Sequence, residues 1–176
     1  MSDRLDLHHD VALYLDIGRR LLGGARPYVD YVEINPPLIH YLHTLPVLLG
    51  RASGLHAHTV MNLLVLVAVG VCALLIRALA RRASQPSMGS LLALVLVVAA
   101  CWTRASDTWG QREHLFVLLA LPHVMSRALR VELRAPAAAV CGVASAVGAC
   151  IKPHFVALLL VVEIFAFVRR EGRRVD

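Results

Sequence analysis

Three carboxylate residues near the start of this chain are of types that suit acid–base chemistry. Asp10 opens a stretch with helical spacing, and Asp30 and Glu33 stand three residues apart in the polar segment that follows it. A carboxylate can act as a general base or as a ligand for a divalent metal ion. Asp10 could equally serve as a helix cap, the use that its position favours when taken alone. Asp30 and Glu33 could equally belong to a solvated surface.

A second polar group occupies the segment DTWGQREHL, residues 107–115. Gln111, Arg112, Glu113 and His114 are consecutive and stand at the mouth of an apolar run. Four hydrogen-bonding or charged side chains that enter a membrane helix are costly unless they face a cavity. The segment is therefore either a functional site or a polar loop followed by the start of a helix, and the sequence favours neither interpretation over the other.

A third polar group is Lys152-Pro153-His154, which interrupts two apolar runs. Lys152 is the one lysine in the chain, since the other 17 of the 18 basic residues are arginines. A cation at a break between helices suits a phosphate or diphosphate group. The alternative is a short turn in which Lys152 extends its charge to water.

The composition decides what kind of protein must position these groups. Of the 176 residues, 58% are hydrophobic and 17% are charged, whereas an average soluble domain has roughly 45–50% apolar and about 25% charged residues. A soluble domain is therefore disfavoured, and a helical membrane protein is favoured. The net charge of +6 comes from arginines that stand between apolar runs. We interpret them as topology signals and expect no nucleic-acid partner.

The apolar runs predict an all-α, polytopic membrane protein with about four to five membrane-spanning helices plus interfacial amphipathic helices. A bilayer span needs about 20 apolar residues. The candidate runs are residues 60–76, 87–103, 115–126, 135–151 and 155–168. Residues 10–22 have the spacing of an amphipathic helix, and residues 36–50 predict a tilted or interfacial helix. Residues 1–36 would form an acidic loop with its amphipathic helix, and residues 37–176 a single membrane region.

The arginines also predict an orientation. Short loops beside the spans are richest in arginine after residue 76, after residue 126 and after residue 168. The positive-inside rule makes that side, with the C-terminus, cytoplasmic. The head of the chain, the loop before residue 115 and the turn at residues 152–154 would then share the outer face. Glu163 lies inside the last run, and we expect it either to be functional or to pair with a helix from another chain.

The order of features in the head resembles that of a known family. The chain has Asp-x-x-x-Tyr, a helix, Gly-Gly-x-x-Pro-Tyr-x-Asp-x-x-Glu and then Pro-Pro-Leu, over residues 9–38. This order is similar to the first outer loop of GT-C integral membrane glycosyltransferases, in particular the bacterial branch similar to protein mannosyltransferases. The resemblance implies inverting transfer of a sugar from a polyprenyl-phosphate donor to an acceptor hydroxyl. It places the catalytic base at Asp10, and it places Glu33 near the lipid phosphate, with direct contact or with a divalent metal ion between them.

The resemblance also implies the remaining roles. The donor phosphate would be bound by Glu33, Arg112, Lys152 and His154, with Asp30, Gln111, Glu113 and His114 in support. No metal-ligand motif is present in the sequence, and no cofactor is expected beyond that optional metal ion. The expected partners are membrane lipids and the donor, in the inner membrane of a bacterium.

The resemblance is incomplete, and it leaves a rival class open. Members of the family normally carry a membrane helix ahead of the acidic loop and several further spans. This chain is therefore expected to correspond to the amino-terminal part of such an enzyme: a fragment, a split or degenerate gene product, or one part of a larger assembly in which another chain supplies the missing helices. The rival is a non-enzymatic polytopic membrane protein, such as a transporter subunit or a scaffold. Convergence of the polar groups in space would favour the enzyme, and scattering would favour the rival.

Overall fold

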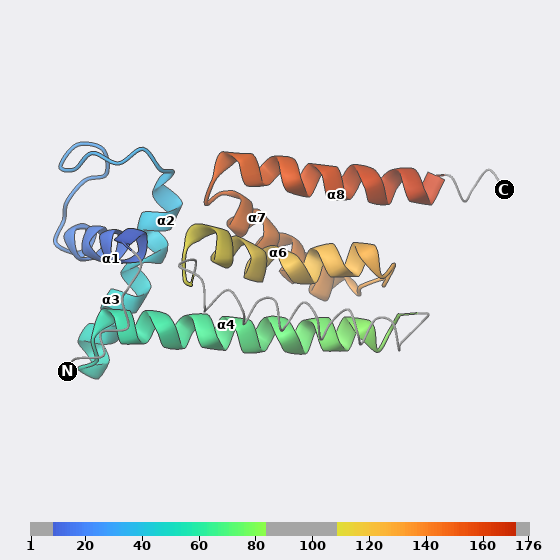
Figure 1. The fold of residues 1–176 in the computed structure, drawn as a ribbon, viewed down its shortest axis with the longest axis horizontal. Coiled ribbons are helices and arrows are strands. Elements are labelled where there is room, and N and C mark those ends of the chain that lie inside the picture. Colours follow the sequence, from blue (N-terminus) through green and yellow to red (C-terminus); the bar gives the residue numbers. More distant parts are fainter. Residues whose placement is uncertain (1–8, 84–108, 172–176) are drawn as a thin grey trace.

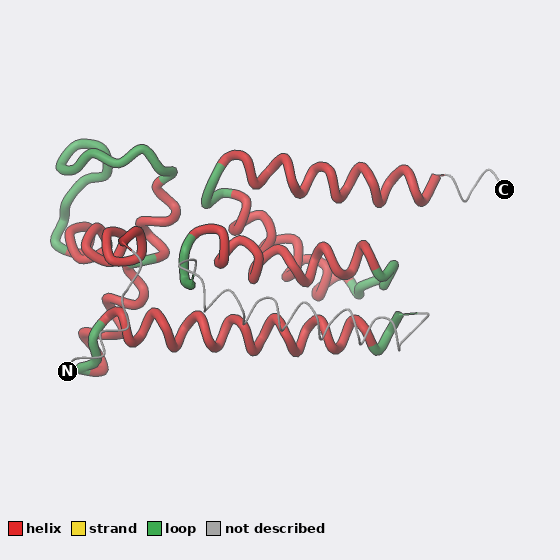
Figure 2. Tube along the Cα trace, viewed as in Figure 1, coloured by secondary structure: helices red, strands yellow, loops and turns green. Residues whose placement is uncertain are grey.

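The computed structural model of the chain describes residues 9–83 and 109–171, and the described residues form helices and no β-strand. Three short helices make a head at one end of the molecule, and the longer helices extend from it side by side (Figure 1). The head contains α1 (His9–Leu22), α2 (Pro37–Leu42) and α3 (Thr44–Ser53). The bundle contains α4 (Ala57–Ala80), α6 (Arg112–Ala128), α7 (Ala135–Ala149) and α8 (Pro153–Glu171). A long non-helical segment joins α1 to α2 (Figure 2).

The predicted amphipathic helix is confirmed as α1. Val11, Leu15 and Gly18 lie on its buried face, as the spacing of these residues predicts. On the outer side, the Arg20 side chain donates to the Asp16 carboxylate over 2.9 Å. The helix stops before a glycine pair whose second member, Gly24, has a left-handed φ of 91°, which glycine adopts without a steric penalty.

The region predicted as one tilted helix over residues 36–50 consists of two helices with a break at His43. Pro46 accounts for the break, because proline has no backbone N–H with which to bond the carbonyl four residues earlier. Such a residue is tolerated in the first turn of a helix, and Pro46 lies in the first turn of α3. The α1 helix crosses this break so closely that a Cβ atom on Gly18 would lie 2.7 Å from the backbone oxygen of His43.

The bundle is held by the apolar faces of its helices. Along α4, Val65, Val69, Cys72 and Ile76 are buried, and they belong to one core together with residues of α1, α3 and α6. A second core joins the head to α6, α7 and α8, where the rings of Phe116 and Phe155 stack 4.2 Å apart. Helices α6, α7 and α8 are thereby fixed to the head.

The prediction of four to five membrane spans is not supported. Within the described residues, α4 alone is long and apolar enough to cross a bilayer. Its 24 residues would extend about 36 Å, against a hydrocarbon layer of about 30 Å. Helices α6 and α7 have 17 and 15 residues, and α8 has 19 but contains Glu163, Arg169 and Arg170. The run at residues 87–103 lies outside the described residues.

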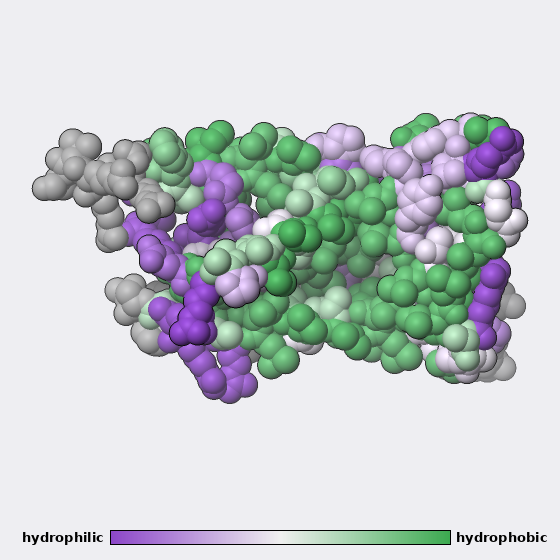
Figure 3. Space-filling view, turned by 180° about the vertical axis from the view of Figure 1, so that it is seen from behind, coloured by the Kyte–Doolittle hydropathy of each residue, from purple (hydrophilic) through white to green (hydrophobic). Residues whose placement is uncertain are grey.

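The surface of the bundle is nevertheless apolar between two hydrophilic ends (Figure 3). Large hydrophobic side chains are exposed on several helices, among them Val67 of α4, Val140 of α7 and Phe165 of α8. We call this surface the apolar belt. Exposed apolar surface of this extent marks contact with a partner or with lipid.

Candidate functional site

An ion pair joins the head to the bundle. The Arg112 Nη2 atom donates to Asp10 Oδ2 over 3.0 Å, and its Nη1 atom donates to the side-chain oxygen of Asn35. The three residues come from α1, from the loop before α2 and from the start of α6. The Arg112 side chain is 14% exposed and that of Asp10 is 30% exposed. The guanidinium is therefore largely enclosed, while Asp10 keeps an edge open to the surroundings.

Local structure explains how each partner is placed. The α1 helix begins at His9, so Asp10 lies in its first turn, where a negative charge is favoured by the helix dipole. Arg112 is the first residue of α6, so its side chain projects from the end of the bundle that faces the head. Tyr14, one turn after Asp10, lies under the guanidinium with 5.5 Å between the ring centroid and Arg112 Cζ.

Tyr14 is part of this site as a protonated phenol. Burial raises the pKa of its hydroxyl to about 12, although the positive charge of Arg112 opposes the shift. The hydroxyl therefore stays neutral at physiological pH and cannot act as a base. Its contribution is the ring face against Arg112, an arrangement that attracts a cation.

Glu33 is brought to the same end of the molecule through Asn35. Its Oε1 atom accepts hydrogen bonds from the Asn35 side chain at 2.5 Å, from the Asn35 backbone at 3.1 Å and from the Ile34 backbone at 2.9 Å. Burial alone would raise the pKa of Glu33, but these bonds outweigh it and the pKa lies below its usual value. Glu33 thus stays ionised and orients Asn35, which in turn contacts Arg112.

A second ion pair lies next to the first. Lys152 Nζ, in the turn between α7 and α8, donates to Glu113 Oε1 at the start of α6. The side chain of Lys152 is 20% exposed. Arg112 Nε and Glu113 Oε2 are both buried and have no hydrogen-bond partner among the described residues. Since an unpaired buried polar atom is costly, these two atoms mark where a further polar group would be favoured.

The other predicted residues are more loosely connected to this centre. His154 is exposed, and its ring packs at 4.8 Å edge-on to Phe155. Gln111 precedes α6 as its N-cap residue. The ring of His114 is buried and accepts the Gly110 backbone N–H over 3.1 Å. Asp30 bonds to Arg26 instead, with 2.7 Å from the Arg26 backbone nitrogen to Asp30 Oδ2.

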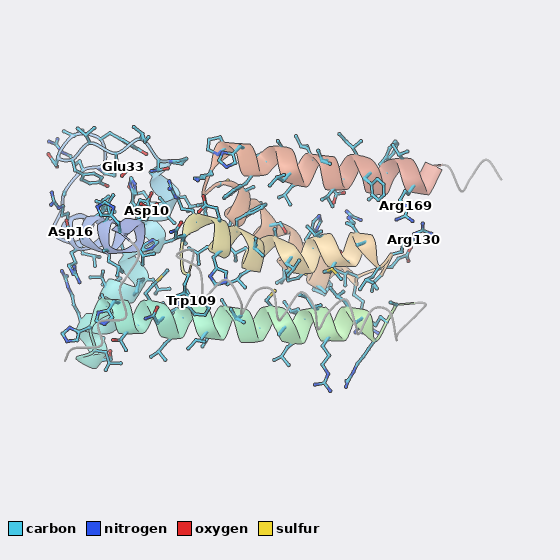
Figure 4. The ribbon with its side chains drawn as sticks, in the orientation of Figure 1. Asp10, Asp16, Glu33, Trp109, Arg130 and Arg169 are labelled. Carbon is cyan, nitrogen blue, oxygen red and sulfur yellow. The ribbon has the colours of Figure 1, made fainter. Side chains whose placement is uncertain are left out.

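Figure 4 shows the resulting distribution. Asp10 and Glu33 lie at the head end, near the start of α6, and Arg130 and Arg169 lie at the opposite end of the bundle. Asp16 lies on the side of α1 that faces away from the bundle. The described parts of the head, of the segment before residue 115 and of the turn at residues 152–154 lie at the same end of the molecule, and their place on the outer face of a membrane stays a prediction. We call Asp10, Tyr14, Asn35, Arg112 and Lys152 the head site.

Glu163 finds its partners inside this chain, so the alternative that it pairs with a helix from another chain is not needed. Its Oε1 atom lies 2.7 Å from His123 Nε2 and 2.9 Å from Arg127 Nε, both on α6. The group lies along the α6–α8 contact and not at the head site. The two partners on α6 compensate the charge of the Glu163 carboxylate, as a charge among apolar helices requires.

The sequence analysis did not select Tyr14 or Asn35. The sequence contained a signal for each of these two residues. Tyr14 follows Asp10 by four residues, which places both on one side of a helix. Asn35 is the polar residue between Glu33 and the proline pair. Tyr14 belongs to the motif Asp-x-x-x-Tyr, and Asn35 lies between the Glu and the Pro-Pro-Leu of the same stretch, but neither was assigned a role.

Within residues 9–83 and 109–171, no three His, Cys, Asp or Glu side chains are grouped as ligands for a metal ion. Oxygen Oε1 of Glu33, the residue proposed near a metal, accepts three hydrogen bonds from neighbouring nitrogens instead. Comparison of the chain with protein-family models, with curated proteins and with solved structures found no match. The functional argument therefore depends on the residues and their geometry.

Proposed function

We propose that this chain is a membrane glycosyltransferase, or part of one, that transfers a sugar from a polyprenyl-phosphate donor to an acceptor hydroxyl. The observation that carries the proposal is the convergence of Asp10, Arg112 and Lys152 at one end of an apolar helical bundle. These residues come from three distant parts of the sequence. The reaction needs a carboxylate and cations for the leaving phosphate, and this end of the bundle has Asp10 paired with Arg112 and, at the next residue of α6, Glu113 paired with Lys152.

In the proposed reaction, Asp10 acts as the general base. Its carboxylate takes the proton of the acceptor hydroxyl while that oxygen forms a bond to C1 of the sugar. The bond between C1 and the phosphate oxygen breaks, and the lipid phosphate leaves with the electron pair. Arg112 and Lys152 stabilise the charge that develops on the phosphate. Glu33 supports the reaction through Asn35, which fixes one edge of the Arg112 guanidinium.

We further propose that the bundle lies in a membrane, the bacterial inner membrane, with the head at the outer face. Support comes from the length of α4, from the apolar belt and from the polar groups at both ends of the bundle. In this arrangement α4 crosses the bilayer, and α6, α7 and α8 pack beside it in the same apolar layer. A polyprenyl chain would then lie along the belt while its phosphate reaches the head site.

A non-enzymatic membrane scaffold is the second candidate, and one observation favours it. Both Arg112 and Lys152 are already paired with carboxylates, as they would be if their role were to attach the head and the α7–α8 turn to the start of α6. The enzyme requires in addition that these pairs open to a phosphate. The two candidates therefore differ in what happens when the Asp10 carboxylate is replaced by an amide.

The test is turnover of a polyprenyl-phosphate sugar by the full chain in membranes. A panel of polyprenyl-phosphate hexoses and pentoses is offered, and release of polyprenyl phosphate is measured for the wild type, Asp10→Asn and Asp16→Asn. The amide retains the size of the carboxylate but cannot accept the proton. Asp10→Asn should lower turnover by about 10²–10⁴-fold, and Asp16→Asn, on the outer side of the same helix, should leave it unchanged.

Full turnover in the Asp10→Asn protein would exclude Asp10 as the base and move the search to Asp30 and Glu33. Equal losses in both variants would indicate damage to α1. The membrane arrangement is tested separately, with reporters fused after Gly54 and after Arg82, at the two ends of α4. The first should report from outside and the second from the cytoplasm, and two reporters on the same side would contradict the crossing of α4.

A further inference from the structure

The end of the bundle opposite the head is dominated by one sign of charge. Helix α4 ends there, α6 ends and α7 begins there, and α8 ends there (Figure 1). Seven exposed arginines stand at these helix ends, and we call them the basic collar: Arg77, Arg81, Arg82, Arg127, Arg130, Arg134 and Arg169. Among the side chains that the structure describes at this end, the exposed carboxylate of Glu132 carries an opposing negative charge. Glu163 neutralises one member by its bond to Arg127.

The head end has a different charge pattern. Its described side chains of both signs are nearly equal in number: Asp10, Asp16, Asp30, Glu33 and Glu113 against Arg19, Arg20, Arg26, Arg51, Arg112 and Lys152. Several of these pair with each other, as Arg20 does with Asp16. Among the described side chains, the excess of positive charge is therefore confined to the collar.

The collar borders directly on the apolar belt. On α8, the guanidinium carbon of Arg169 lies 5.1 Å from the ring centroid of Phe165, and that ring is 60% exposed. An arginine above an exposed apolar ring is placed where hydrocarbon gives way to polar groups. A partner that fills both surfaces must present hydrocarbon to the belt and negative charge to the collar, and a phospholipid with an acidic headgroup has this combination.

We infer that the basic collar binds the headgroups of acidic phospholipids in the leaflet that surrounds it. Nucleic acid would satisfy the charge of the collar but not the adjoining apolar belt. Each guanidinium can donate two parallel hydrogen bonds to phosphate oxygens. The inference rests on the membrane arrangement proposed above and does not depend on sugar transfer.

The test uses the full chain in phosphatidylcholine vesicles that contain either spin-labelled phosphatidylglycerol or spin-labelled phosphatidylcholine. The motionally restricted fraction of each lipid gives the selectivity of the protein surface. The wild type should prefer phosphatidylglycerol by about threefold or more, since each basic residue near an acidic surface contributes a severalfold gain in binding. Arg81→Gln/Arg82→Gln should reduce the preference by at least about half. The control Arg19→Gln/Arg51→Gln removes two exposed arginines from the head end and should retain it.

A second measurement covers the case in which the collar variant folds poorly. In the wild type, 0.5 M salt should reduce the selectivity, because screening at high ionic strength weakens exposed charge pairs. Wild-type selectivity near one would overturn the inference, as would equal losses in the collar and control variants. Alkaline carbonate extraction distinguishes the two proposals. A chain that stays in the membrane without selectivity contradicts only the lipid inference, whereas a chain that is extracted contradicts the membrane arrangement as well.

Discussion

The Arg112 Nη2 atom lies 3.0 Å from Asp10 Oδ2, although 102 residues separate the two positions in the chain. This contact fastens the head to the start of α6, and it brings together the two polar segments that the sequence analysis selected independently. Both side chains are more enclosed than a typical surface pair. We therefore expect their interaction to contribute more than the few tenths of a kcal/mol that exposed pairs usually give.

A double-mutant cycle of Asp10→Asn and Arg112→Gln should measure this contribution. Each single variant leaves one partner of the pair without its counter-charge, so each should lower the free energy of unfolding. We expect the two effects to be non-additive, with a coupling energy of about 1–2 kcal/mol. Chemical denaturation in detergent micelles gives the four free energies. Additive effects would show that the pair contributes nothing beyond its separate residues.

Lys152→Ala and Arg112→Ala should each weaken binding of a lipid phosphate by about tenfold or more, because a hydrogen bond to a charged group contributes about 1.5–3 kcal/mol. Arg51→Ala is the matched control, since Arg51 is exposed at the same end of the molecule but outside the head site. The probe is undecaprenyl phosphate in detergent micelles, and the readout is the dissociation constant. Equal losses in all three variants would indicate general electrostatic attraction instead of a site.

The stability of the head should decrease in mild acid because of His43. Burial lowers the pKa of His43 to about 4, while an unfolded histidine has a pKa near 6.5. Above pH 6.5 both states are neutral and the head has its full stability. As the pH falls from about 6.5 to about 4, the unfolded chain binds a proton that the folded chain does not, which costs up to about 3 kcal/mol.

Replacement of His43 by leucine should remove most of this pH dependence. The remaining slope should come from the other groups with shifted pKa values, among them His40, whose pKa burial also lowers. Unfolding midpoints recorded from pH 4.5 to pH 7.5 give the comparison, with His56→Leu as the control because His56 is exposed. A His43→Leu protein with the slope of the wild type would contradict the assignment.

Two glycines in helices should respond in opposite ways to alanine. At Gly18 a Cβ atom would lie 2.7 Å from the His43 backbone oxygen, so α1 and the α2–α3 break would have to separate. We expect Gly18→Ala to lower the free energy of unfolding by about 1–3 kcal/mol. At Gly70, inside α4, no atom of the described part of the chain lies within 4 Å of that position.

Gly70→Ala should therefore raise the free energy of unfolding by about 0.5–1 kcal/mol, because alanine loses less backbone freedom than glycine in a helix. Thermal unfolding of the two variants and the wild type shows in one experiment whether each substitution lowers or raises the free energy of unfolding. Destabilisation at both positions would imply a neighbour over Gly70 that the present packing does not contain.

The positions of the helices were predictable from sequence because they depend on local spacing. The apolar stripe of Val11, Leu15 and Gly18 predicts α1, and the uncharged run that begins at Val60 predicts α4. The predicted number of spans is not supported, because it counted apolar residues and not helix lengths, and within the described residues α4 alone is long and apolar enough to cross a bilayer. Arg134 precedes α7, and the turn at Ile151 and Lys152 follows it, which shortens a run of 17 apolar residues to a helix of 15.

The sequence also identified Asp10, Glu33, Arg112 and Lys152 as candidates, since charged residues beside apolar runs are visible without a fold. It could not assign their partners. The pairing of Asp10 with Arg112 and that of Glu113 with Lys152 each join helices far apart in the chain, and Glu163 meets His123 and Arg127 only because α8 packs on α6. Helical periodicity relates residues three or four positions apart, whereas these contacts depend on how whole helices pack against each other, and only the tertiary structure determines that.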